Sequence, residues 1–146
     1  MDLSGLKWPL IIVAIVGIGW LGTSGGIQWM YGNFTKAAPG VDVNQDIRDE
    51  AGLTKLAGYT YFLWKWKETI AIIETSMERY GDGAPNYWYN MERLSNCYDR
   101  IGNYKMSLEI LELLMRARAW EVDPRVPNRE QLNLRANTLK EMHELR

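Results

Sequence analysis

The fold of this 146-residue chain depends on one stretch, residues 8–35, which reads WPLIIVAIVGIGWLGTSGGIQWMYGNFT. The stretch contains no Asp, Glu, Lys or Arg, and its first half is almost purely apolar. Trp8 and Trp29 are 21 residues apart, or about 31 Å along a helix, which is close to the thickness of a bilayer core. Tryptophans are typical of both membrane interfaces. The sequence therefore predicts one transmembrane helix from Pro9 to Tyr31, after a short N-terminal tail of residues 1–8.

Two other interpretations of this stretch stay open. A cleaved signal peptide has a basic start, a shorter apolar region and a small-x-small cleavage site. Here Asp2 accompanies Lys7 at the start, and the stretch continues into Gly-Ile-Gln-Trp-Met-Tyr without a clear cleavage site. A buried helix of a soluble core would be hard to enclose in a domain of about 110 further residues. A single-pass membrane helix remains the favoured interpretation.

The orientation of the predicted span depends on the Lys and Arg residues near its two ends. The N-terminal side offers Lys7, and the C-terminal side offers Lys36 and Arg48. This bias is nearly nil. We expect the N-terminus inside and the main domain on the outer, extracytoplasmic side.

Small residues mark one face of the predicted span. Gly19, Gly22, Thr23 and Gly26 follow the spacing i, i+3, i+4, i+7, which places them along one stripe of a continuous helix. Such stripes allow a second helix to approach closely. We therefore predict that these four residues bind a partner helix, although glycines are also common in membrane helices that have no such partner.

Composition excludes several classes of function. The chain has 17 Lys and Arg against 18 Asp and Glu, a net charge of −1, which disfavours nucleic acid as a partner. Its single cysteine, Cys97, allows no intrachain disulfide and no Cys-rich zinc site. The single histidine, His143, would have to carry any catalytic triad or multi-His metal centre alone. We therefore predict no enzyme, no catalytic residues, no bound metal and no cofactor.

The rest of the chain divides into a connector and a helical domain. Residues 32–51 lack a sustained apolar period and are predicted to connect the span to a domain of residues 52–146. No convincing strand pattern appears in the domain. The fold class is therefore predicted to be all-α, with one N-terminal transmembrane helix followed by about five helices. Apolar residues at helical spacing, separated by Gly, Pro and Asn breaks, place these helices at about 52–64, 66–80, 86–101, 104–120 and from Asn128 onward.

Paired helices with short turns suggest an internal repeat. The clearer copy reads Met91-x2-Leu94-Ser95-x2-Tyr98, then Gly102-Asn103-Tyr104, Ser107, Leu111 and Leu114. A weaker copy reads Leu53-x2-Leu56-Ala57-x2-Thr60, then Trp66, Thr69, Ile73 and Ser76. These patterns resemble the tetratricopeptide repeat family, with a spacing of 38 residues between Leu56 and Leu94 instead of that family's 34.

The resemblance covers residues 53–120, with the C-terminal helix as a cap. It departs from the family where Met91 and Leu53 stand in place of the usual tryptophan. The resemblance implies a small array of α-hairpins that acts as a protein-interaction scaffold. An unrelated bundle of α-hairpins is the alternative.

Two groups of aromatic residues lie on the predicted helices. Tyr61, Phe62, Leu63 and Trp64 are consecutive, so they cannot all face one core. Exposed Trp and Tyr side chains are common anchors at protein interfaces. We therefore predict that the partner-binding residues include Tyr61, Trp64, Trp88 and Tyr89. The alternatives are that these rings pack in the core, stack on a sugar, or lie at the membrane surface beside Trp29 and Tyr31.

Together these features predict a membrane-anchored accessory or scaffolding subunit of a larger membrane protein complex. Its expected partners are the lipid bilayer and the protein subunits of that complex, bound through the transmembrane helix and the helical domain. Joining two weak contacts in one chain raises the overall affinity through effective concentration. The alternative function is a free membrane-anchored receptor or chaperone that binds short peptides.

Overall fold

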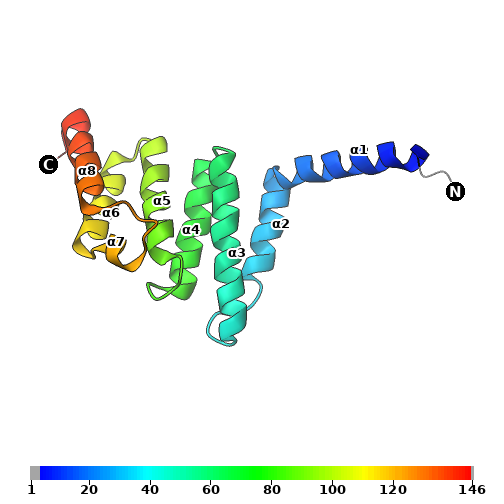
Figure 1. The fold of residues 1–146 in the computed structure, drawn as a ribbon, viewed down its shortest axis with the longest axis horizontal. Helices are drawn as coiled ribbons and strands as arrows, with labels where there is room; N and C mark the ends of the chain where they lie inside the picture. The colour runs from blue at the N-terminus through cyan, green and yellow to red at the C-terminus, as the bar shows by residue number, and fades with distance from the viewer. Residues whose placement is uncertain (1–3, 146) are drawn as a thin grey trace.

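The structure is a computed structural model that describes residues 4–145, and in this range the chain forms α-helices and no strand (Figure 1). The predicted all-α class is therefore confirmed for the described residues. The helices are α1 (Ser4–Leu21), α2 (Ser24–Thr35), α3 (Val43–Phe62), α4 (Trp66–Tyr80), α5 (Tyr87–Arg100), α6 (Tyr104–Arg116), α7 (Ala119–Val122) and α8 (Arg129–His143).

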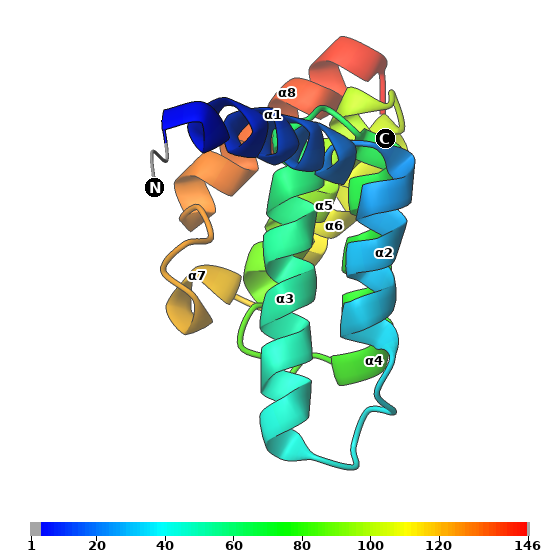
Figure 2. The ribbon, with the colours of Figure 1, turned by 90° about the vertical axis from the view of Figure 1, so that its right-hand side faces the viewer.

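Helices α2 to α8 form an array that we call the stack, and α1 extends away from it (Figures 1 and 2). Each long helix of the stack packs mainly on its neighbours in the chain: α2 on α3, α3 on α4, α4 on α5, α5 on α6, and α6 on α8. The core runs through the whole stack because every helix contributes apolar residues at helical spacing. Ser95 and Ser107, the small residues of the clearer repeat copy, are both fully buried.

Local sequence signals define where the stack helices begin and end. The Asp42 side chain accepts hydrogen bonds from two backbone N–H groups at the start of α3. Asn103 caps α6 in the same way. A capping box begins α8, where Asn128 and Gln131 each accept a hydrogen bond from the other's backbone N–H.

The predicted continuous helix from Pro9 to Tyr31 is wrong. Helix α1 ends at Leu21, α2 begins at Ser24, and their axes differ by 75°. Thr23 fits this break because its hydroxyl accepts from the Gly26 N–H at the start of α2. Within the part of the chain that the structure describes, no single helix has both the length and the apolar character to cross a membrane. The two bent segments together meet that test by length and composition only.

Helix α2 belongs to the stack. Ile27 is buried in the core, Phe34 packs against it, and the hydroxyls of Tyr31 on α2 and Thr75 on α4 lie 3.0 Å apart. The predicted connector of residues 32–51 is therefore mostly helical, and only residues 36–42 are irregular. The physical reason is that α3 starts at its Asp42 cap, well before its first run of buried leucines.

The C-terminal half follows the prediction closely. Helix α6 ends at Arg116 instead of continuing to residue 120, and the short α7 follows after Arg118, which has left-handed backbone angles (φ 52°). Helix α8 packs on α6 through Leu132 and Leu139, as a cap should. Met142, in the last turn of the same helix, is exposed.

Candidate functional site

Helix α1 is an apolar arm with no protein core around it (Figure 1). Its apolar side chains are exposed on all sides, and its main contact within the described chain is with α2. Soluble monomers rarely expose contiguous apolar patches larger than roughly a few hundred Å², and larger patches mark membrane or protein contacts. The exposed residues on the arm are Trp8, Leu10, Ile11, Ile12, Val13, Ile15, Val16, Ile18 and Trp20.

The predicted stripe of small residues does not exist as one face, because the helix breaks within it. Gly19 faces open space, whereas a Cβ on Gly26 would clash with the backbone of Leu21 across the bend. Thr23 lies at the break itself, where it caps α2. Gly22 faces the stack: a Cβ there would lie 3.3 Å from the Tyr59 hydroxyl. The small residues at 22, 23 and 26 therefore fit the bend, and only Gly19 faces outward.

The bend between α1 and α2 lies against the turn between α3 and α4. A Cβ on Gly22 would be 3.8 Å from the Leu63 side chain, in addition to the Tyr59 contact. Trp20 of α1 and Trp29 of α2 pair across the bend, with ring centroids 6.1 Å apart. Both the bend and the α3–α4 turn lie at the same end of the stack (Figure 1).

The aromatic turn, which we define as residues 61–66, differs from the other predicted aromatic sites because it exposes two large rings. Phe62 and Trp64 are each 78% exposed. Tyr61 is half-buried and packs edge-on against Trp66, with ring centroids 5.0 Å apart. Of the predicted partner-binding aromatics, Trp64 is therefore the one that is fully available to a partner.

The backbone of the aromatic turn is strained. Trp64 has a φ of 58°, in the left-handed region that costs a residue with a Cβ about 1–2 kcal/mol. This conformation follows the last turn of α3, where the Leu63 N–H bonds the Tyr59 carbonyl and the Trp64 N–H bonds the Tyr61 carbonyl. This strained position after a helix end is usually occupied by glycine, but here it carries Trp64, whose bulky ring is exposed.

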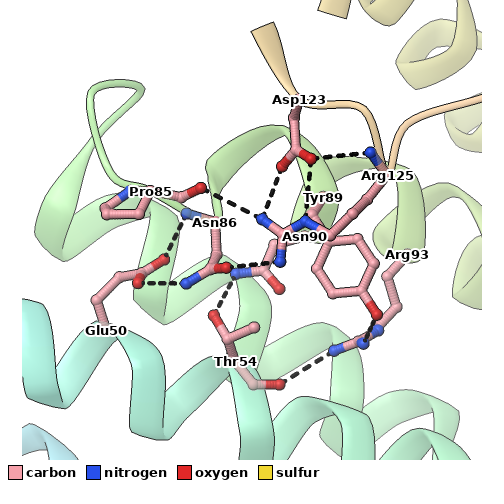
Figure 3. A network of polar contacts seen from close by, with 9 residues as sticks. All are labelled: Glu50, Thr54, Pro85, Asn86, Tyr89, Asn90, Arg93, Asp123 and Arg125. Carbon is pink, nitrogen blue, oxygen red and sulfur yellow. Dashed lines mark hydrogen bonds and ion pairs between the residues drawn. The ribbon is translucent and has the colours of Figure 1, made fainter. Parts of the chain in front are cut away.

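Trp88 and Tyr89 lie elsewhere and are engaged within the chain. Trp88 packs edge-on with Tyr87, at a centroid distance of 5.0 Å. The Tyr89 ring contacts the guanidinium groups of Arg93 and Arg125, at 4.5 and 4.4 Å from the ring centroid (Figure 3). The structure thus divides the four predicted aromatic residues between two separate places.

A polar network that sequence reasoning missed ties α3 to α5 (Figure 3). Glu50, only 2% exposed, accepts hydrogen bonds from the Asn86 backbone N–H at 3.2 Å and its Nδ2 at 2.7 Å. Asn90, 1% exposed, donates to the Thr54 hydroxyl at 2.8 Å. Arg93 donates to the Thr54 carbonyl at 3.0 Å. These bonds pair most of the buried polar atoms and hold the two helices in register, although within the described residues the Asn90 Oδ1 has no hydrogen-bond partner.

These contacts recur at a constant sequence spacing. Glu50 and Asn86, and Thr54 and Asn90, are both pairs 36 residues apart across α3 and α5. Asp99 of α5 and Arg135 of α8, joined at 2.6 Å, are also 36 residues apart. Pairs of polar residues at this separation, on segments predicted to be helical, are a signal that could have pointed to these contacts from the sequence.

The loop after α7 is joined to the same network by hydrogen bonds of Arg125. Arg125 donates to the Asp123 carboxylate at 2.7 Å and to the Asn86 side-chain oxygen at 2.9 Å. These bonds hold the pKa of Asp123 below its ordinary value, despite the opposing effect of burial. The network therefore links helices within the stack, and its polar groups form hydrogen bonds mainly with one another.

The two candidate reactive residues, Cys97 and His143, both pack against other parts of the chain. Cys97 is fully buried, and this burial raises the pKa of its thiol to about 12, so it is a poor nucleophile. His143 stacks on Tyr104, with ring centroids 3.5 Å apart. Over the residues whose side chains are described, no group of three or more His, Cys, Asp or Glu residues is placed to hold a metal ion.

Comparisons with protein-family models, curated proteins and solved structures find no match to this chain. The arm and the aromatic turn are therefore the features from which a function can be inferred.

Proposed function

We propose that this protein is a membrane-anchored accessory or scaffolding subunit of a larger membrane protein complex. In this proposal α1 lies in the bilayer, and the stack of α2 to α8 lies outside it, on the extracytoplasmic side. The observation that carries the proposal is the exposure of apolar side chains all around α1. A helix that is apolar on every side is stable in lipid or inside a protein, and water is its least favourable surrounding.

The length of α1 favours a complex over an isolated anchor. Its uncharged residues, 8–21, measure about 21 Å along the helix, which is less than a hydrocarbon core of about 30 Å. A short apolar helix is accommodated by local thinning of the bilayer or by packing against other transmembrane helices. Packing against partner helices also covers Gly19, which has open space beside it.

The regular organisation of the stack supports a scaffolding role. Its helices are ordered as antiparallel neighbours, α8 covers one end, and three polar contacts between helices each join residues 36 positions apart. We propose on this basis that the stack is a tetratricopeptide-like array. Arrays of this kind use their extended surfaces for protein binding, and their end units need a cap or a partner.

We do not extend the proposal to peptide binding between α3 and α5. The polar side chains that face each other there, from Glu50 to Arg125, mainly bond one another (Figure 3). A peptide would have to break these bonds before it could form its own. We likewise propose no catalytic activity.

The decisive experiment compares two matched pairs of substitutions in the full chain. The first, Ile12→Lys with Val16→Lys, places charges at i and i+4 on α1. The second, Val43→Lys with Ile47→Lys, does so at exposed apolar residues of α3. A lysine near the centre of a bilayer costs about 2.5–3.5 kcal/mol. We therefore expect the variant with the α1 pair to be removed from membranes by an alkaline wash, and the variant with the α3 pair to be retained.

Gentle detergent extraction of native membranes then tests the complex. We expect the wild-type chain to co-migrate with other membrane proteins, which mass spectrometry identifies. The variant with the α1 pair should no longer co-migrate with them. Two results would contradict the proposal. The first is a wild-type chain that washes off membranes in alkaline carbonate. The second is a stable monomer in mild detergent with no associated chains.

A further inference from the structure

We propose that the aromatic turn is a second membrane contact, in which Phe62 and Trp64 enter the lipid headgroup region beside the root of α1. This inference rests on the proposed function, because it takes α1 to be in the bilayer. It adds a defined face of the stack that lies on the membrane, and it names lipid as the occupant.

The position of the turn follows from its contact with the bend. If α1 lies in the bilayer, its last residue, Leu21, is at the membrane surface, and so is Gly22. Gly22 lies directly beside Leu63 and Tyr59, since a Cβ on it would be within 3.8 Å of both side chains. Leu63 separates Phe62 from Trp64 in the chain, so both exposed rings are held near the same surface.

The exposure of the two rings distinguishes them from the rest of the stack. Tyr61 and Trp66 in the same turn pack on each other, whereas Phe62 and Trp64 lie outside the packing. The left-handed backbone at Trp64 places strain at a residue whose side chain is largely exposed. Transfer of the exposed ring from water into the lipid headgroup layer is favourable and opposes that strain.

The charges around the turn fit a lipid surface. Lys65 lies within it, Lys67 follows it directly, and the Arg100 guanidinium lies 5.6 Å from the centre of the Trp66 ring. The first acidic residue after the turn is Glu68. Exposed aromatic rings beside basic side chains are typical of the membrane interface, where the rings enter the headgroup layer and the cations face phosphates. A protein partner would not require the turn to sit at the root of the arm.

The chain permits a direct test by site-specific labelling. Its only cysteine, Cys97, is fully buried with a thiol pKa of about 12, so an exposed cysteine introduced elsewhere is labelled selectively. We would prepare the full chain with Phe62→Cys or Trp64→Cys and attach an environment-sensitive fluorophore. Val43→Cys, exposed at the opposite end of α3, is the matched control, and Ile15→Cys reports on α1.

Each labelled protein is reconstituted into phosphatidylcholine vesicles, with and without phosphatidylglycerol, that contain brominated lipid as the quencher. We expect strong quenching at 15, clear quenching at 62 and 64 that increases with phosphatidylglycerol, and almost none at 43. Circular dichroism checks that the variants keep wild-type helix content.

The outcomes separate the two proposals. Quenching at 15 together with values at 62 and 64 no higher than at 43 would overturn the membrane contact of the turn and leave the anchor intact. That result would also be obtained if the turn binds a protein partner instead of lipid. Absence of quenching at 15 would overturn the proposed anchor itself, and the inference with it.

Discussion

The docking of α2 on α3 makes Gly52 the most informative position for substitution. A Cβ on Gly52 would overlap the ring of Phe34, which packs on the core from α2. Gly52→Ala therefore forces the two helices apart, and overpacking of this kind costs about 1–3 kcal/mol. Alanine also favours a helix over glycine by about 1 kcal/mol. We expect a net loss of about 0–2 kcal/mol in the free energy of unfolding.

Gly32→Ala is the matched control, because Gly32 is also inside a helix but a Cβ on it would meet nothing within 4 Å. The helix-propensity gain is common to both substitutions, so it cancels in their difference. We expect Gly52→Ala to be less stable than Gly32→Ala by about 1–3 kcal/mol. In a chain of this size, each kcal/mol lowers the melting temperature by about 4 °C. The assay is urea and thermal unfolding of the full chain in mild detergent, followed by circular dichroism.

A second substitution on α2 identifies the cause. Phe34→Leu shortens the opposing side chain, so the penalty of Gly52→Ala should decrease in that background, and a double-mutant cycle measures the coupling. Equal stabilisation by Gly52→Ala and Gly32→Ala would refute the reasoning. Strict additivity of Gly52→Ala with Phe34→Leu would refute it as well. Either result would mean that α2 does not rest on α3.

Three further predictions concern the stack. Cys97 should react with maleimide only after the chain unfolds. Because the pKa of its thiol is about 12 in the folded chain and ordinarily 9.0, the contribution of Cys97 to the free energy of unfolding should be complete below pH 9 and should decline as the pH rises towards 12. Fast labelling of the folded chain would contradict this. Arg125→Met should cost about 1.5–3 kcal/mol by stranding the Asp123 carboxylate. Because the folded pKa of Asp123 lies below 3.8, urea unfolding should show that deficit in full above that pH and shrinking as pH falls through the folded value. Gly102→Ala should lower the free energy of unfolding by about 1–2 kcal/mol, since Gly102 has a φ of 80°. Gly83→Ala, measured in the same way, should change the free energy of unfolding little. Equal effects of the two substitutions would argue against a left-handed turn at Gly102.

The stack was largely predictable because its signals are local. Apolar residues at helical spacing lie on one side of each helix from α4 onward, and breaks such as Gly81 and Gly102 have the positive φ that such turns need. The capping box at Asn128 fixed the start of α8. Such signals act within a few residues, so they can be interpreted from the sequence without a knowledge of partners.

The start of α3 was missed for a specific physical reason. Residues 43–52 contain few apolar side chains, and two of the buried residues there, Asp49 and Glu50, are charged in type. Glu50 is buried because Asn86, 36 residues later, supplies two donors. A hydrophobic period cannot report a helix whose inner face is satisfied by hydrogen bonds from a distant segment.

The sequence by itself determined the all-α class, the order of helical hairpins and an uncharged, apolar N-terminal segment, because helix period and composition are properties of neighbouring residues. Tertiary structure alone decided where that segment bends. An uncharged run from Trp8 to Thr35 is compatible with a straight helix, and the break at Thr23 becomes favourable when Ile27 and Phe34 find a core on α3. The energy that separates the bent from the straight form therefore comes from contacts with residues far along the chain.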